Sequence, residues 1–373
     1  MKWCVGWTLT VGGLLLLLLG FASLSQAEAE DQISVVSAEK CDALDIPDAS
    51  LRAFRAPNGS ITAFATHYRN RALVGRSFET MKKNCSVVYE GALDPDSSHF
   101  DYKTWIAATW LADDGSVIAL GHNEYQAHEL PGHCRFSDYR SCWYNSIVLL
   151  KSDDLGHTFH RLDHNEAIVA PEFTDAVGQG HPRGYTSPTN LVRWGDYLYT
   201  LVGYSGSEKA DTGRCLLRTR LPVTSDSWEI RSSEGFVHPN KSPYGSDGSK
   251  VHCLYVTGMR GFVGSIARLA DTKLFVATVA EDVDGGSIVA YFSDDLIHWH
   301  DRYVLEKLPL FWSKDCSSGK RFSYPSLIDE SSTSPNFDVI GRAATLYIVQ
   351  GGCKVGSDLK LVKTSVTISL PPG

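Results

Sequence analysis

Short apolar segments alternate with polar turns along most of the chain. Stretches such as "FRAPNGSITAFATH", "ATWLADDGSVIALGHNEY" and "NLVRWGDYLYTLVGY" each place two apolar runs on either side of an Asn-Gly, Asp-Asp-Gly or Gly-Asp turn. This pattern is typical of paired β-strands, because Asn, Asp and Gly adopt the backbone angles that a tight hairpin requires. Signals for helices are scarce. The pattern therefore predicts an all-β chain.

One type of strand recurs at a nearly constant period. It is an apolar run that ends in a small hydroxyl residue, and its five copies are separated by 75, 67, 74 and 71 residues. A hairpin precedes each copy, so the repeated unit is strand, turn, strand, loop, strand. Five such units predict a single five-bladed β-propeller domain over residues 28–373. The copies are "ALVGRS" ending at Ser77, "IVLLKS" at Ser152, "CLLRT" at Thr219, "IVAYFS" at Ser293 and "LKLVKT" at Thr364.

The first 27 residues have a different character. Lys2 precedes an apolar run through "LLLLLLG", and the small residues Ser25 and Ala27 flank Gln26. This is the pattern of a secretory signal peptide that is cut near Ala27. We therefore expect a secreted or periplasmic protein that is not inserted in a membrane.

Cysteine usage agrees with export. Removal of Cys4 with the signal peptide leaves eight cysteines, which allow up to four disulfides in an oxidising compartment. Cys134 and Cys142, eight positions apart, are the pair that we predict; the other pairings stay open.

The charge of the chain limits its partners. The formal net charge is −8 for the whole sequence, and loss of residues 1–27 removes the single positive charge of Lys2, which leaves −9. An acidic surface argues against nucleic acid or an anionic membrane as a partner. We expect a monomer with neither nucleic acid nor a membrane among its partners.

Two repeats carry a turn motif. "SDDLGHTF", Ser152 to Phe159, has the form S-x-D-x-G-x-T-F, and "SDDLIHW", Ser293 to Trp299, is a looser version. The first resembles the Asp box of sialidases and other propeller proteins. Its Asp caps a tight turn and its Gly takes a backbone angle that other residues avoid, so the motif supports the fold and says nothing about a substrate.

Strand ends locate the candidate site. In a propeller, the inner strand of each blade starts on the face to which the second strand returns, so residues at these positions converge on the central funnel. Inner-strand starts nominate Asp45, Asp48, Tyr185, Ser187 and Tyr324, and second-strand ends nominate His67, His122, Glu124 and Glu281.

Two short stretches resemble a known enzyme group. "DIPDASLRAF", in which Asp48 opens the first inner strand, and "YPSL", which opens the last, resemble the five-bladed propellers of glycoside hydrolase family 43 and its relatives, and "SDDLIHW" matches a turn common in them. The resemblance implies a funnel with three carboxylates, acting as base, acid and a residue that tunes the acid, and it implies action on furanosides and some pyranosides. Asp48 alone falls on a comparable motif, as the candidate base.

Glycosidic cleavage needs a protonated carboxyl at the leaving oxygen and an ionised carboxylate across the sugar ring. Glu124 is the first candidate acid, because an aromatic, partly buried setting raises the pKa of a carboxyl. Glu281 is the second. Each candidate also has a structural interpretation, as a turn residue for Asp48, a buried ion pair for Glu124 and a solvated acidic loop for Glu281. The prediction is a glycoside hydrolase.

Two other functions stay open. "AFRAP", which contains Arg55, resembles the Phe-Arg-Ile-Pro region of sialidases, whose arginine grips a substrate carboxylate; Arg218 would be a second such residue. A non-catalytic carbohydrate-binding propeller would instead use aromatic rings, and Trp143, Tyr144 and Tyr185 could stack on sugars or pack between blades.

Metal chemistry has little support in the sequence. The HExxH pattern is absent, and the histidines of "HNEYQAHELPGHC" fit no known zinc spacing. We expect no metal in the site and no required cofactor, while a structural ion at the centre of the ring stays possible.

Overall fold

The structure is a computed structural model that describes residues 1, 33–37, 39–244, 250–313, 316–354, 356 and 358–370. The predicted signal peptide lies outside these residues apart from Met1. Residues 35–373 form one unit. Helical turns among its described residues are single 3-10 turns: η1 (Ser97–His99), η2 (Ala127–Glu129), η3 (Tyr139–Cys142) and η4 (Ser225–Ser227).

The described strands form five antiparallel meanders, or blades, in chain order. Each repeated strand is the third strand of its blade, when the interrupted inner strand of blade three, β10 with β11, is counted as one. The prediction of an all-β, five-bladed propeller is confirmed.

Blade one is β2 (Arg52–Arg55), β3 (Ile61–Phe64), β4 (Leu73–Gly75) and β5 (Lys82–Lys83). Blade two is β6 (Lys103–Leu111), β7 (Val117–Gln126), β8 (Trp143–Ser152) and β9 (His160–Arg161). Blade three is β10 (Arg183–Thr186), β11 (Val192–Trp194), β12 (Tyr197–Ser205), β13 (Thr212–Arg220), β14 (Trp228–Ser232) and β15 (Gly235–Val237).

A short strand from the segment of blade five pairs with the inner strand of blade four. Blade four is β16 (Phe262–Leu269), β17 (Phe275–Glu281), β18 (Ser287–Ser293) and β19 (His300–Glu306), and blade five is β20 (Arg321–Ile328), β22 (Ala343–Gly351) and β23 (Lys360–Thr367). Between β20 and β22, the short β21 (Val339–Ile340) pairs in parallel with β16. A further two-residue strand, β1 (Ser34–Val35), precedes blade one along the chain.

The inner strand of blade three is interrupted. β10 pairs in parallel with β8 of blade two at Arg183 and Tyr144, and the chain then leaves the ladder at Ser187 and Pro188 before β11 begins. Proline has no N–H to give to a ladder. The carbonyl of Pro188, outside the ladder, instead accepts from Arg52 at 3.0 Å.

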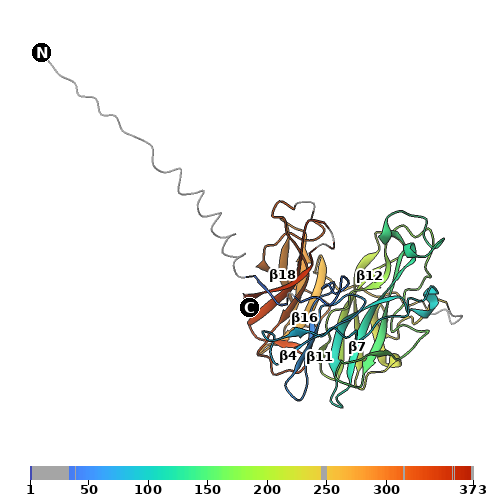
Figure 1. Cartoon of the computed structure of the whole chain (residues 1–373), viewed down its shortest axis with the longest axis horizontal. Helices are drawn as coiled ribbons and strands as arrows, with labels where there is room; N and C mark the ends of the chain where they lie inside the picture. Colours follow the sequence, from blue (N-terminus) through green and yellow to red (C-terminus); the bar gives the residue numbers. More distant parts are fainter. Residues whose placement is uncertain are drawn as a thin grey trace. The chain divides into compact units, whose positions relative to one another are not determined.

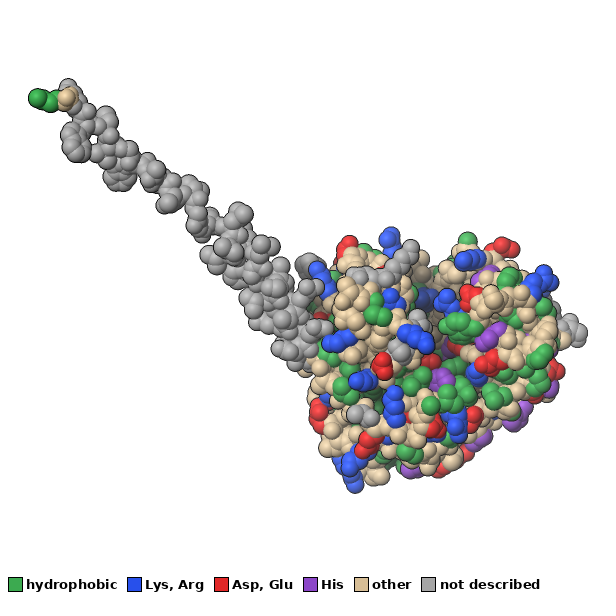
Figure 2. Space-filling model, turned by 45° about the horizontal axis from the view of Figure 1, so that its top comes forward, with side chains coloured by type: hydrophobic (Ala, Val, Ile, Leu, Met, Phe, Trp, Pro, Cys, Tyr) green, Lys and Arg blue, Asp and Glu red, His purple; other side chains and the backbone are tan. Residues whose placement is uncertain are grey.

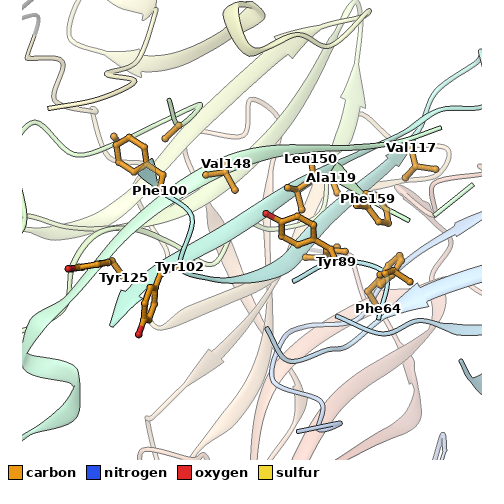
Figure 3. Close-up of a cluster of buried hydrophobic side chains, with 14 of the residues drawn as sticks. Phe64, Tyr89, Phe100, Tyr102, Val117, Ala119, Tyr125, Val148, Leu150 and Phe159 are labelled. Atoms are coloured by element: carbon orange, nitrogen blue, oxygen red, sulfur yellow. The ribbon is translucent and has the colours of Figure 1, made fainter. Parts of the chain in front are cut away.

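Apolar side chains fill the spaces between adjacent blades. Phe64 of blade one meets Phe159 of blade two edge to face, with ring centroids 5.8 Å apart, and the surrounding cluster is drawn in Figure 3. The ring closes where Phe78 of blade one packs on Tyr347 of blade five; Figure 1 shows the blue first blade beside the red last one. Burial between blades, repeated around the ring, is the main source of stability.

The outer turn of blade two forms as its sequence predicts. Asp154 accepts hydrogen bonds from the Thr158 backbone N–H at 2.9 Å and from the Ser152 hydroxyl at 2.7 Å. Gly156 has a φ of +85° and Phe159 is buried. Burial acts to raise the pKa of Asp154, but the hydrogen bonds from Thr158 and Ser152 outweigh it and lower the pKa to about 2.

Four disulfides join the eight cysteines. The predicted Cys134–Cys142 pair is confirmed, and the other pairs are Cys41–Cys85, Cys215–Cys253 and Cys316–Cys353. Such a complement is typical of proteins from an oxidising compartment.

The surface carries charges of both signs. Acidic and basic side chains are interspersed over the face drawn in Figure 2, which is hollowed between raised regions. Within the described ranges, the structure contains no helix of the length and apolarity needed to cross a membrane.

Candidate active site

Strand β7 presents a stripe of alternating side chains. Because successive side chains of a strand point to opposite faces, His122, Glu124 and Gln126 share one face. Tyr125 points to the other face, where its ring packs against Tyr102 with centroids 5.5 Å apart. The motif "HNEYQ" is therefore divided between the core and a polar face.

The neighbouring strands extend this polar face. Cross-strand partners on one face of a sheet lie close enough to touch, and here they add two indole rings and an ammonium group beside the stripe. The pairs are Lys103 with Glu124 and Trp105 with His122 on β6, and Trp143 with Gln126 on β8.

Asp48 approaches the same face from blade one. Its backbone N–H donates to the carbonyl of Thr66 at 3.3 Å, which holds the segment just before β2 against the loop after β3. Burial raises the pKa of the Asp48 carboxyl to about 6, although donation from Tyr324 and Trp105 acts in the opposite direction. Asp48 is therefore a weak base that is ionised at neutral pH.

Glu124 is more strongly shifted than Asp48. Burial raises its pKa to about 8; the hydrogen bond from Gln126 and the charge of Lys103 act to lower it, and the charge of Asp48 adds to the rise. The Gln126 Nε2 donates to Glu124 Oε2 at 2.7 Å, and Glu124 Oε1 lies 3.8 Å from Nδ1 of His122. Glu124 is therefore protonated at neutral pH, so one cavity holds a carboxylate and a carboxylic acid.

Both carboxyls line a cavity of about 380 Å³. Ligand pockets of this size hold small molecules. Aromatic side chains form much of the wall, and sugar rings stack on such surfaces through their C–H groups. These side chains are Tyr68, Trp105, Tyr139, Trp143, Phe262, Phe311 and Tyr324.

Three polar atoms on this wall have no hydrogen-bond partner among the described residues: Ser50 Oγ, His67 Nδ1 and Trp143 Nε1. Buried polar groups are nearly always hydrogen-bonded, so three open ones around one cavity indicate a site that a polar ligand completes. The indole group of Trp143 can only donate.

Two lining residues have strained backbones. Ser187 has a φ of +47° and Tyr324 a φ of +53°, in the left-handed region that non-glycine residues rarely adopt. Ser187 stands at the break in the inner strand of blade three, and Tyr324 at an irregularity between β20 and β22. Residues held in this way cluster at functional sites.

Arg52 closes the bottom of the cavity where four blades meet. Its guanidinium donates to the carbonyls of Leu51 at 3.1 Å, Ala107 at 2.5 Å, Pro188 at 3.0 Å and Gly264 at 2.8 Å. Burial lowers its pKa to about 9. A charged side chain thus binds the carbonyls that a central structural ion would need.

Seven of the residues nominated from the sequence line this cavity: Asp48, His67, His122, Glu124, Trp143, Ser187 and Tyr324. Four nominated residues do not line it, and the structure corrects their expected positions. Asp45 binds Lys83 at 2.9 Å, and Glu281 binds Arg302 at 2.7 Å and accepts from Tyr291 at 2.5 Å. Tyr144 is buried between strands, with its hydroxyl donating to the carbonyl of Phe173 at 3.0 Å, and Tyr185 packs on Tyr204.

The alternation of side chains along β6 and β7 indicates further cavity-lining residues that the rule based on strand ends missed. Lys103, Trp105 and Gln126 line the cavity but were not nominated, although "KTW" and "HNEYQ" place them in step with Glu124. Arg52 and Tyr139 had no such signal, because their roles depend on contacts between distant blades and on the folding of a loop.

The loop that carries Tyr139 is pinned beside the cavity. The Cys134–Cys142 disulfide closes it, the ring of Tyr139 packs on Trp143 with centroids 5.3 Å apart, and both rings line the cavity. The histidine-rich stretch thus consists of one strand end in the site and one stapled loop at its edge. The described residues contain no group of three or more His, Cys, Asp or Glu side chains arranged to hold a metal ion.

The arginines required by the sialidase alternative lie outside the cavity. Arg55 donates to the carbonyl of Ser332 at 2.6 Å and stacks over Phe337. Arg218 is paired with Glu229 at 2.6 Å. Neither arginine lines the cavity, so this alternative loses the group that would bind a substrate carboxylate.

Comparison with known proteins supports the fold. No family model matches the chain, and no curated protein matches it. Among solved structures, the catalytic domain of the family 62 α-L-arabinofuranosidase of Coprinopsis cinerea matches with a TM-score of 0.51 and 10% sequence identity, over 90% of this chain and 95% of that one. A family 117 glycoside hydrolase of Zobellia galactanivorans (TM-score 0.49, 9% identity, 91% of each chain) and an endo-arabinase of Bacteroides thetaiotaomicron (TM-score 0.47, 13% identity, 88% of this chain and 98% of that one) are also similar. At these identities the similarity concerns the fold alone.

Proposed function

We propose that the protein is an exported, monomeric glycoside hydrolase in which Glu124 is the general acid and Asp48 the general base. The observation that carries this proposal is one cavity with two carboxyl groups whose pKa values differ, about 6 for Asp48 and about 8 for Glu124. Near pH 7 one is ionised and the other protonated. Glycosidic cleavage needs this combination.

The reaction that we propose is a displacement by water. Glu124 gives its proton to the glycosidic oxygen as the bond from that oxygen to the anomeric carbon breaks, so the leaving sugar departs as a neutral alcohol. Asp48 takes a proton from a water whose oxygen bonds to the anomeric carbon. Exchange with solvent then restores Glu124 to the acid and Asp48 to the carboxylate, and no cofactor takes part in these steps.

The walls of the cavity suit a neutral sugar. Indole and phenol rings offer apolar faces for stacking, and the unpaired N–H group of Trp143 can donate to a ring hydroxyl. The fold resembles that of the catalytic domain of an α-L-arabinofuranosidase. We therefore propose α-L-arabinofuranosides as the first substrates to test, followed by pyranosides such as xylosides.

The test compares wild type with Glu124→Gln and Asp48→Asn on arabinan oligosaccharides and on 4-nitrophenyl α-L-arabinofuranoside. Loss of an acid or base costs about 10² to 10⁴ in rate. Because 4-nitrophenolate leaves without protonation, Glu124→Gln should lose far less on the aryl substrate than on the oligosaccharides. Asp48→Asn should lose activity on both.

A matched control uses a carboxylate outside the cavity. Glu281 is buried and paired with Arg302, so Glu281→Gln tests loss of a buried charge without touching the cavity, and its folding is checked by thermal melting. If wild type releases no sugar from any substrate but binds oligosaccharides by calorimetry, the protein is a carbohydrate-binding propeller and the hydrolase proposal is wrong.

A further inference from the structure

The hydrogen bonds of Asn145 orient the ring of His122. Asn145 Nδ2 donates to the carbonyl of Arg183 at 2.8 Å, which turns the amide so that its oxygen faces His122. His122 Nε2 lies 3.2 Å from this Asn145 Oδ1. An amide oxygen only accepts hydrogen bonds, so Nε2 of His122 carries a proton.

The net charge of the His122 ring then determines whether its other nitrogen, Nδ1, carries a proton. Burial lowers the pKa of His122 to about 4, against a smaller rise from Asn145, so the ring is neutral at pH 7. A neutral imidazole with its proton on Nε2 has a bare lone pair on Nδ1. The Nδ1 atom that carries this lone pair lies 3.8 Å from Oε1 of Glu124.

A second chain of hydrogen bonds orients Glu124 from the opposite side. Lys103 Nζ can only donate, and it binds Gln126 Oε1 at 2.9 Å. The Gln126 amide is therefore turned so that its Nε2 donates to Glu124 Oε2 at 2.7 Å. Because Oε2 is already an acceptor, the proton of the Glu124 carboxyl belongs on Oε1, which is the oxygen nearest His122.

We propose that His122 is a positioning residue for the acid, whose Nδ1 lone pair holds the carboxyl proton of Glu124 on Oε1 until it moves to the substrate. This inference rests on the proposed role of Glu124. At 3.8 Å the two atoms are beyond hydrogen-bond distance, and the inference requires that they approach when substrate binds, as catalytic contacts do in other enzymes. During turnover the proton leaves Oε1 for the glycosidic oxygen and returns from solvent, while His122 stays neutral.

Other charged or titratable groups face this pair and act on its titration. The charge of Asp48, from blade one, raises the pKa of Glu124 and that of Lys103, from β6, lowers it. Tyr324 from β20 is coupled to both carboxyls. The remaining titratable groups on the cavity are His67, Tyr68, Tyr139 and Arg52.

Two substitutions of His122 separate this role from simple packing. A glutamine places its terminal amide three bonds from Cβ, where Nε2 was, and so keeps the bond to Asn145 but lacks an acceptor near Glu124. An asparagine places its oxygen two bonds from Cβ, where Nδ1 was, and so keeps that acceptor. In kcat against pH, we expect His122→Gln to move the alkaline limb down by about one unit, which lowers kcat about tenfold above that limb. His122→Asn should keep the limb within a few tenths of wild type. In His122→Gln, KM should change less than kcat.

A measurement without substrate tests the inference on its own. Long-range proton–nitrogen NMR of the wild type near pH 7, assigned by the signals lost in His122→Gln, should show the Nε2–H tautomer of His122. A proton on Nδ1, an imidazolium, or equal shifts of the alkaline limb in both variants would overturn the inference. If the wild type proves inactive, the proposed function fails while the tautomer measurement still decides the orientation of His122.

Discussion

Asp48 and Glu124 reach one cavity from different blades, and the charge of Asp48 contributes to keeping Glu124 protonated. Burial is the largest cause of the raised Glu124 pKa, and the Asp48 carboxylate adds to it. The two residues stand 76 positions apart in the sequence. Their coupling follows from the ring, which brings the start of blade one beside the end of the second strand of blade two.

The first prediction concerns the pH profile of hydrolysis. Activity needs Asp48 ionised, so kcat/KM should rise as pH increases through about 6, and it needs Glu124 protonated, so kcat/KM should fall as pH increases through about 8. The expected profile is a bell with its maximum near pH 7. On the aryl substrate, which needs little help from the acid, the alkaline limb should be shallow in wild type and absent in Glu124→Gln. An unchanged alkaline limb in that variant would show that another group is the acid.

The second prediction tests the coupling directly. Asp48→Asn removes the negative charge that raises the pKa of Glu124, so this pKa should fall by about one unit. Carbon-13 NMR titration of the labelled Glu124 carboxyl measures it without substrate. Asp45→Asn is the control, because Asp45 binds Lys83 away from the cavity. Equal behaviour of the two variants would contradict the coupling.

The third prediction concerns stability against pH. The unfolded chain releases the Glu124 proton near 4.5, the ordinary pKa of a glutamate, whereas the folded protein keeps it up to about pH 8. The raised folded pKa means that wild type loses stability as pH rises between these values. Glu124→Gln cannot titrate, so its advantage in unfolding free energy over wild type should grow through this window, to the order of a few kcal/mol. Urea unfolding at several pH values measures it, with the exposed Glu39→Gln as baseline.

Part of this site was predictable from the sequence and part was not. The period of the hydroxyl-ended strands predicts the five blades, and strand ends nominate Asp48, His122 and Glu124, because both are local properties that the ring only repeats. Glu281 and Tyr185 satisfy the same rule but lie off the cavity, since their side chains find partners in Arg302 and Tyr204. Position along a strand does not determine such side-chain partners.

The fourth prediction concerns Arg52. Arg52→Met removes the guanidinium and leaves carbonyls of four blades without their donor, and each unpaired buried group costs about 1 to 3 kcal/mol. We expect a loss of at least about 3 kcal/mol in urea unfolding. Arg76→Met is the control, because Arg76 also donates to a carbonyl, that of Asn58 at 2.6 Å, but on the surface. Equal losses in the two variants would mean that the central position adds nothing.

The fifth prediction concerns the stapled loop. Changing Cys134 and Cys142 together to serine frees η3, which holds Tyr139 against Trp143. In the chain-entropy account this costs about 2 to 3 kcal/mol of stability. KM should rise several-fold with kcat nearly unchanged, because the loop contributes cavity wall and not the acid or base. The Cys215–Cys253 pair, changed in the same way, is the control for loss of a disulfide whose enclosed loop contributes no described residue to the cavity wall.

The contacts of Arg52 also limit how early in synthesis the centre of the propeller can be completed. It belongs to the first blade to leave the ribosome, but its partner carbonyls at Ala107, Pro188 and Gly264 follow 55, 136 and 212 residues later. The contact with Gly264 therefore cannot form before blade four has been synthesised. A nascent chain that stops before blade four leaves this cation incompletely paired and the ring open.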